Sequence, residues 1–402
     1  MSVRTMVMSF LLLSILISNS SFSAQSEFEA FMDQQQEDLG SEQAEFSAYK
    51  KELEAGFAAY QQIYQEEFSA YKAEIMAQWG EFRDSSRTRW VSYAQNGEVR
   101  RSVDYETGRF EIDLLIDEKI DPAQVQQNLD KQIYLLLNSS ESDAFQSDKL
   151  AQKVEKRLLS VSNLVEQGKP SEKRLFPMEN LTSLRINNSG FYRVSSVAGN
   201  AVEKNVLSSP VPGKKIVKAS FEIPESLLNK ALRYAESVQL AAEKEKIPSS
   251  LIFAVMETES SFNPMAKSGV PAYGLMQIVP RSAGKDATKY LHGKPRILAP
   301  SYLYVSDNNI TIGSAYLHVL YYKYMRKVKD PTSRLYCTIA AYNTGPGNVA
   351  KAFINIRNFG RAVKKINSLK PEQVYDILYK QLPHRETRHY VEKVSTRMEK
   401  YL

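Results

Sequence analysis

The chain has 402 residues, a net charge of +6 and a hydrophobic content of 43%. This length exceeds what one ordinary core covers, so two or more domains are expected, and the composition excludes a disordered or fibrous protein. The single cysteine, Cys337, excludes an intrachain disulfide and a cysteine-rich metal site.

Residues 1–24 have the pattern of a secretory signal peptide. Arg4 precedes an apolar run over residues 6–17, and small polar residues lead to a cleavage position near Ser23 or Ala24. The run is short for a membrane span, so a retained anchor is the less favoured alternative. No cysteine follows the run, and no lipid anchor is therefore expected.

Residues 25–88 contain an aromatic repeat of 11 residues. Phe46, Phe57 and Phe68 each begin a Phe-x-Ala-Tyr unit, and a related unit begins at Trp79. Because 11 residues make three helical turns, these rings lie on one side of a single long helix, predicted over residues 31–82. The stripe is expected to pack on the protein's own body or on a second copy. Self-association, or a protein partner, through this helix is the resulting hypothesis.

Charge is divided unevenly along the chain. Residues 26–90 contain 14 acidic and 6 basic residues, which leaves the remainder strongly basic. A basic body suits a nucleic acid, an anionic membrane surface or an anionic cell-wall polymer. The sequence has no zinc-finger spacing, Walker loop or aromatic RNA-binding signature, so nucleic acid is the weakest of these three candidates.

Residues 89–224 are predicted to form a small α+β accessory domain. Alternating residues over 90–116, with turns at Asn96-Gly97 and Thr107-Gly108, predict a three-stranded antiparallel meander. Helices are expected over 121–138 and 147–165, a polar connection over 168–176 and a strand over 213–223. This region contains no catalytic constellation, which favours docking or wall binding.

The pattern from residue 225 onward is helical. Helices are expected over 226–244, 249–260, 310–327, 333–342, 371–381 and 386–401. The predicted fold class is thus a multidomain α+β protein: a long N-terminal helix, a small α+β domain, and a mostly α-helical domain over 225–402 that can bury its own core.

A carboxylate ends the helix predicted over residues 249–260. Ser249 or Ser250 can cap the helix, apolar positions at 251, 252, 255 and 256 give it a buried face, and Asn263-Pro264 prevents its continuation. Glu259 therefore lies at the end of an element, before a small-residue loop. A glutamate in a last turn is usually a solvated charge, and Glu257, on another side of the helix, suits that role better.

Four short pieces of this region together resemble the lytic murein transglycosylases with a goose-lysozyme-like (SLT) catalytic domain. They are ESSFNP at 259–264, GLMQI at 274–278, AYNTGPG at 341–347 and Tyr390. Each is weak alone, since AYNTGPG also fits a helix end followed by a glycine turn, but their order is specific. The resemblance is closest to the membrane-bound lytic murein transglycosylase C group, extends faintly into the α+β region, and leaves out the aromatic helix.

The resemblance implies a lysozyme-like fold and cleavage of the β-1,4 bond between N-acetylmuramic acid and N-acetylglucosamine in peptidoglycan, with a 1,6-anhydro product. Peptidoglycan glycan strands are then the partner, with no cofactor, no metal and no nucleic acid. The implied location is the periplasm of a Gram-negative bacterium, peripheral to the membrane or the wall. Relatives of this type often carry a lipid anchor, which does not transfer here because the cysteine is missing.

The resemblance implies that Glu259 is the general acid and then the base. The residues implied to bind substrate are Ser268, Met276, Gln277, Tyr342, Asn343 and Tyr390. Met276 and Gln277 would line the sugar groove, and the hydroxyl of Tyr390 would approach the catalytic carboxylate. Each has a simpler alternative: a core methionine, a turn-stabilising asparagine at 343 and a helix-packing tyrosine at 390. The loop departs from the family at Pro271-Ala272-Tyr273, where a Gly-Ala pair is common.

Two alternatives to a transglycosylase stay open. A hydrolytic lysozyme commonly needs a second carboxylate; no aspartate lies at a motif-like position, and Asp286 and Asp307 are left open for this role. A non-catalytic wall-binding scaffold would use the aromatic helix as its working part. The four histidines are too scattered to predict a metal site.

Overall fold

The structure of the protein is a computed structural model that describes residues 21–176, 196–197, 200–269 and 271–402. Residues 1–20, most of the predicted signal peptide, lie outside the described residues. The chain divides into two compact units, residues 1–54 and residues 55–402. Within the part of the chain that is described, no helix is long and apolar enough to cross a membrane.

The aromatic repeat lies on one long helix, α1 (Ser21–Trp79). This helix begins before residue 31, and it ends at Trp79 because Gly80 adopts a φ of +70°, the left-handed conformation that terminates many helices. From Phe57 onward, the rings of Tyr60, Tyr64 and Tyr71 and the indole of Trp79 are buried within the unit of residues 55–402. This part of the stripe thus packs on the protein's own body, the first of the two predicted arrangements.

The buried stripe touches two different parts of this unit. The rings of Tyr71 and Trp79 each meet Tyr93 edge to face, with centroids 6.2 Å apart. Nearer to residue 55, Tyr60 packs against Tyr273 at 6.5 Å. Each such aromatic pair stabilises by about 0.5–1.5 kcal/mol beyond its burial. The last turns of α1 therefore join the β-sheet to the helical region.

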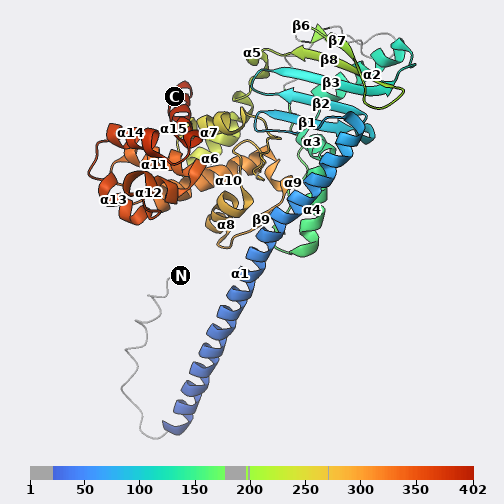
Figure 1. Ribbon diagram of the computed structural model, residues 1–402. Helices are drawn as coiled ribbons and strands as arrows, with labels where there is room; N and C mark the ends of the chain where they lie inside the picture. The colour runs from blue at the N-terminus through green and yellow to red at the C-terminus, as the bar shows by residue number, and fades with distance from the viewer. Residues whose placement is uncertain (1–20, 177–195, 198–199, 270) are drawn as a thin grey trace. The chain divides into compact units, whose positions relative to one another are not determined.

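A five-stranded antiparallel sheet follows α1, in the order β1-β2-β3-β8-β7 (Figure 1). Its strands are β1 (Arg89–Ala94), β2 (Val99–Asp104), β3 (Arg109–Asp117), β8 (Lys214–Glu222) and β7 (Glu203–Ser208). The predicted meander is confirmed, with its first turn made by Asn96 and Gly97, both at positive φ. The strand predicted over 213–223 is confirmed as β8.

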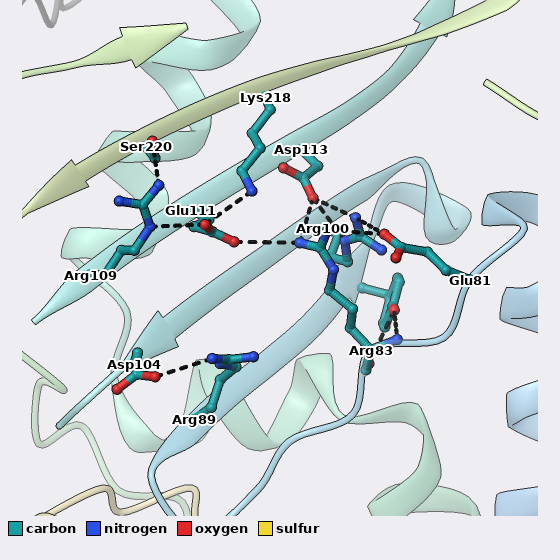
Figure 2. A network of polar contacts seen from close by, with 11 residues as sticks. Glu81, Arg83, Arg89, Arg100, Asp104, Arg109, Glu111, Asp113, Lys218 and Ser220 are labelled. Carbon is teal, nitrogen blue, oxygen red and sulfur yellow. Dashed lines mark hydrogen bonds and ion pairs between the residues drawn. The ribbon is translucent and has the colours of Figure 1, made fainter. Parts of the chain in front are cut away.

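A network of charged side chains covers one face of this sheet (Figure 2). Arg100 and Asp113 face each other across β2 and β3; each side chain is 2% exposed, and Nη2 lies 2.6 Å from Oδ2. Arg83 contacts the same Asp113 oxygen at 3.2 Å, and Glu81 accepts from Arg100 at 2.8 Å. The guanidinium of Arg100 also lies 4.5 Å from the centre of the Trp79 ring. The network therefore fixes the segment after α1 to the sheet.

Three helices accompany the sheet. They are α2 (Pro122–Leu137), α3 (Glu141–Ser147) and α4 (Lys149–Val161). The prediction missed α3, which is short and begins with a capping box made by Ser140 and Asp143. Two small pairs complete this region: β5 (Ser196–Val197) with β6 (Asn200–Ala201), and β4 (Val165–Glu166), which runs parallel to β9 (Ile297–Leu298).

Two buried glutamates tie these helices to the helical region. Glu155 of α4 accepts hydrogen bonds from the backbone N–H and the hydroxyl of Ser301, both at 2.9 Å. Glu141 of α3 accepts from the backbone N–H and the hydroxyl of Ser306, the first residue of helix α10 (Ser306–His318). Burial raises the pKa of Glu141, and the Ser306 donors oppose that rise. A helix N-terminus favours such a carboxylate, so α10 is positioned by an element that lies far from it in the sequence.

The region after residue 224 is mostly helical, as predicted. Its helices are α5 (Glu225–Leu228), α6 (Ala235–Glu245), α7 (Ser249–Ser260), α8 (Lys285–His292), α9 (Pro300–Leu303), α10 (Ser306–His318), α11 (Pro331–Thr344), α12 (Pro346–Ile354), α13 (Phe359–Ile366), α14 (Pro371–Gln381) and α15 (Arg385–Lys400). The helix predicted over 226–244 is broken, because Asn229 ends α5 at a φ of 43°. The helix predicted over 310–327 gives way after His318 to a π-helical turn, Val319–Tyr324.

Candidate active site

Glu259 lies in the last turn of α7, and the backbone ends the helix immediately after it. Ser261 and Phe262 both have positive φ, 51° and 65°, so the helix stops before Asn263-Pro264 is reached. The predicted serine cap is wrong: Pro248 precedes the first turn, and no side chain caps it. The apolar face of α7 is buried as predicted, against α6 and α15. The chain therefore places a carboxylate at the end of a buried helix.

The carboxyl group of Glu259 is buried, with only 6% of the residue exposed. Burial raises its pKa to about 7, because a low-dielectric surround disfavours the charged form. The hydroxyl of Tyr390 and the positive charge of Arg87 oppose this rise, and the negative charge of Glu386 adds to it. A carboxylic acid with such a pKa can both give and accept a proton near neutral pH.

Glu257 is not the solvated surface charge that the sequence analysis expected, because its side chain is only 17% exposed and has partners within the protein. Its carboxylate accepts from the hydroxyl of Tyr401 at 2.7 Å and pairs with Lys400 at 3.2 Å. It is thus bound to the end of α15, on another side of α7 from Glu259. The two glutamates of this helix therefore have different partners and lie on different sides of α7.

Two tyrosines from different helices face Glu259. The hydroxyl of Tyr390, on α15, is buried and interacts with the Glu259 carboxylate, although it makes no hydrogen bond of ordinary geometry. The hydroxyl of Tyr342, on α11, donates to the backbone carbonyl of Met276 at 2.8 Å. Burial and the nearby charge of Glu259 raise the pKa of both phenols, so both stay protonated. The Tyr390 hydroxyl can donate a hydrogen bond to the acid, whereas the single proton of the Tyr342 hydroxyl is bound by the Met276 carbonyl.

The glycine loop is built around a buried asparagine that sequence reasoning missed. Asn309 of α10 donates to the carbonyls of Tyr273 and Leu303 and accepts from the Met276 N–H, each at 2.8 Å. Gly274 has a φ of +74°, and a Cβ there would lie 2.3 Å from the Asn309 amide nitrogen. Only glycine therefore fits this position. Asn309 lies with other polar residues in the first turn of α10, and no pattern in the sequence indicated its role.

The side chains of Gln277 and Met276 differ in burial and in their contacts. The amide nitrogen of Gln277 donates to the Gly274 carbonyl at 3.2 Å, whereas its Oε1 is buried without a hydrogen-bond partner. Met276 is fully buried, and a Cβ added at Gly313 would lie 2.2 Å from its sulfur. The side chain of Met276 is thus enclosed against α10, while its carbonyl orients Tyr342.

The other implied residues lie on the surrounding elements. Asn343, next to Tyr342, accepts from the hydroxyl of Thr387 at 2.7 Å, which links α11 to the first turns of α15. Ser268 is half-buried, and its N–H donates to the Ala272 carbonyl at 3.2 Å. Both roles in substrate binding stay predictions.

The two aspartates considered as second carboxylates are bound elsewhere. Asp286 accepts from the hydroxyl of Tyr324 at 3.0 Å. Asp307 accepts from Ser237 and pairs with Lys173, and these contacts lower its pKa against the effect of burial. The carboxylate whose charge acts on Glu259 is instead Glu386, in the first turn of α15.

Residues 236–364, which include Glu259, match the family described as Transglycosylase SLT domain. The resemblance predicted from the motifs is confirmed. Six of the seven implied residues fall within this SLT-like region, whereas Tyr390 lies beyond it on α15. Arg87 and Glu386, the two charges that act on Glu259, also lie outside it, and no motif in the sequence pointed to them.

The SLT-like region has relatives among known lytic transglycosylases. Membrane-bound lytic murein transglycosylase C from Serratia proteamaculans is 44% identical over 179 residues, which are 44% of this chain and 49% of the relative. The protein of the same name from Sodalis glossinidius is 42% identical over the same shares. The chain thus spans about half the length of the curated relatives it matches.

Two solved structures are also similar over part of the chain. The lytic transglycosylase Slt from Pseudomonas aeruginosa is 29% identical, and the 70 kDa soluble lytic transglycosylase from Escherichia coli is 28% identical. Each similarity covers 42% of this chain and 24% of the other, with a TM-score of 0.33.

Proposed function

We propose that the protein is a peptidoglycan lytic transglycosylase that cleaves the β-1,4 bond between N-acetylmuramic acid and N-acetylglucosamine and leaves a 1,6-anhydro end. The observation that carries the proposal is Glu259: a buried carboxyl with a pKa of about 7, beside two protonated tyrosines, inside an SLT-like region. The names of the relatives, lytic murein transglycosylases, support the same substrate.

The proposed reaction uses one carboxyl twice. Protonated Glu259 gives its proton to the glycosidic oxygen, the C1–O bond breaks, and the N-acetylglucosamine part leaves as an alcohol. The ionised carboxylate then accepts the proton of the muramoyl C6 hydroxyl as O6 bonds to C1. The acid is thereby regenerated, and no water is consumed. Tyr390 is proposed to donate a hydrogen bond to the carboxylate or to the sugar at the stage when charge develops, and Tyr342 is proposed to hold the glycine loop through the Met276 carbonyl.

Supporting roles follow from the positions of the other residues. We assign Gln277 to the floor of the groove, because the residue is 8% exposed and its Oε1 has no hydrogen-bond partner in the protein. Met276 is assigned a supporting role beneath the loop, and Asn343 and Ser268 are assigned to the groove wall. The proposed layout is a signal peptide at 1–24, a helix at 25–88, an accessory domain at 89–224 and the transglycosylase domain at 225–402. Export to a Gram-negative periplasm belongs to this proposal, and self-association through α1 stays a prediction.

Digestion of purified sacculi tests the reaction. Purified full-length protein should release muropeptides that end in 1,6-anhydromuramic acid. Reducing-end muramic acid would assign the protein to the hydrolytic lysozymes. Binding to sacculi without release of any muropeptide would support a wall-binding scaffold.

The pH dependence of turnover should follow the charge of Glu259. Because the first step needs the protonated acid, kcat/KM should fall as pH rises through about 7, and it should be nearly independent of pH over the unit or two below. Initial rates on soluble glycan strands at constant ionic strength measure this profile. A fall in kcat/KM centred near pH 4.5, the ordinary pKa of a glutamate, would show that the surroundings of Glu259 do not desolvate its carboxylate.

A further inference from the structure

Residues 81–88, which belong to the segment between α1 and β1, lie outside the SLT-like region but against the loop that follows Glu259. We call these residues the strap. Its first half is fixed to the sheet by the network of Figure 2, in which Arg83 contacts Asp113 and Glu111 at 3.2 and 3.4 Å. Its second half therefore has a fixed starting point beside the site.

The second half of the strap is bound to the residues just after α7. Asp84 pairs with Lys267, a lysine that is only 5% exposed, at 2.7 Å. The N–H of the same Lys267 donates to the Ser86 carbonyl at 3.3 Å, and the Asn263 amide donates to the Arg87 carbonyl at 3.2 Å. A buried lysine has a strong requirement for a counter-charge, so this attachment is specific rather than incidental.

The strap places one further charge beside the acid. The guanidinium of Arg87 pairs with Glu386 at 3.0 Å, and Glu386 lies in the same helix as Tyr390, one turn earlier. Arg87 thus joins the N-terminal half of the chain to the first turn of α15. Both charged groups act on Glu259, together with the Tyr390 hydroxyl. The negative carboxylate of Glu259 in turn acts on the phenols of Tyr342 and Tyr390.

We propose that the strap is a wall of the active site and that Arg87, whose guanidinium pairs with Glu386 one turn before Tyr390, is a positioning residue that sets the balance of charge around Glu259. This inference rests on the proposed function and adds to it that the site is incomplete without residues 81–88. The SLT-like region supplies the catalytic acid, and the N-terminal half supplies a positive charge, on Arg87, that favours the ionised form of Glu259.

The two members of the ion pair should move the pH profile in opposite directions. Arg87→Gln removes a positive charge that favours ionised Glu259, so the falling limb of kcat/KM should move to higher pH. Glu386→Gln removes a negative charge that disfavours it, so the limb should move to lower pH. Each shift should be about half a pH unit, the size expected for a partly exposed charge. Arg87→Lys keeps the charge and should restore the wild-type profile.

Arg89→Gln is the matched control. Arg89 lies two residues further along, is half exposed and pairs with Asp104 on the sheet at 3.2 Å. Purified full-length variants are compared on soluble glycan strands, with thermal unfolding recorded for each. The inference is overturned if Arg87→Gln and Arg89→Gln give the same profile while the wild type turns over. A wild type without turnover would instead contradict the proposed function.

Discussion

Replacing Glu259 by glutamine should lower kcat by at least about 10²- to 10⁴-fold, the usual contribution of a general acid or base. The amide has nearly the same shape, so the fold should persist, but it cannot give a proton to the glycosidic oxygen. Release of muropeptides from sacculi, followed over hours, measures the loss. Glu257→Gln is the matched control, because Glu257 lies in the same helix and binds Lys400 and Tyr401 instead.

The same substitution should change stability with a defined sign. The folded-state pKa of Glu259 is raised to about 7 from an ordinary value of 4.5. Its stabilising effect is therefore complete below pH 4.5 and is lost as pH rises through about 7. Glu259→Gln should consequently gain stability relative to the wild type between pH 5 and pH 8. Full activity in this variant, or a stability difference independent of pH, would contradict the assignment of the acid.

Replacing Asp113 by alanine should destabilise the fold by about 3–5 kcal/mol, the range found when one partner of a buried ion pair is removed. Arg100 and Asp113 are each 2% exposed, so the substitution leaves Arg100 buried with Glu81 as its remaining partner. Because Asp113 also holds Arg83, the strap should loosen as well. Urea unfolding monitored by tryptophan fluorescence measures the change, since Trp79 lies under Arg100.

An exposed pair provides the comparison for Asp113. Asp376 and Lys380 are one helical turn apart on α14, 2.8 Å from each other, and both side chains are at least 60% exposed. Such pairs contribute little, so Asp376→Ala should change stability by less than about 0.5 kcal/mol. Similar losses in the two variants would show that the network on the sheet is no stronger than a surface pair.

Features set by local sequence were predictable. The meander follows from alternation and from Asn96-Gly97, and α7 follows from its apolar face and the break after Ser260. The errors lie where short elements or single residues decide. The apolar periodicity predicts one unbroken helix over residues 226–244, but Asn229 ends its first part. Helix α3 is too short to show a period of its own.

The site was predictable only in part because its charges come from distant segments. Glu259 and the tyrosines were found through motifs, but Arg87 is 172 residues away from the acid in the sequence and has no motif around it.

The departure of the loop from the family pattern at Tyr273 is also explained by a contact with a distant segment. The ring of Tyr273 fills the space beside Tyr60 of the aromatic helix and packs edge to face on Tyr304 at 5.4 Å. The unusual loop residue Tyr273 and Tyr60 of the aromatic repeat therefore pack against each other.

The measurement that tests the central claim most directly is digestion of sacculi in water enriched in ¹⁸O, followed by mass spectrometry of the released muropeptides. If one carboxyl performs both proton transfers and the C6 hydroxyl is the nucleophile, the products should end in anhydromuramic acid and contain no ¹⁸O. Reducing-end products that carry ¹⁸O at C1 from the start of the reaction would contradict the account, because water would then be the nucleophile.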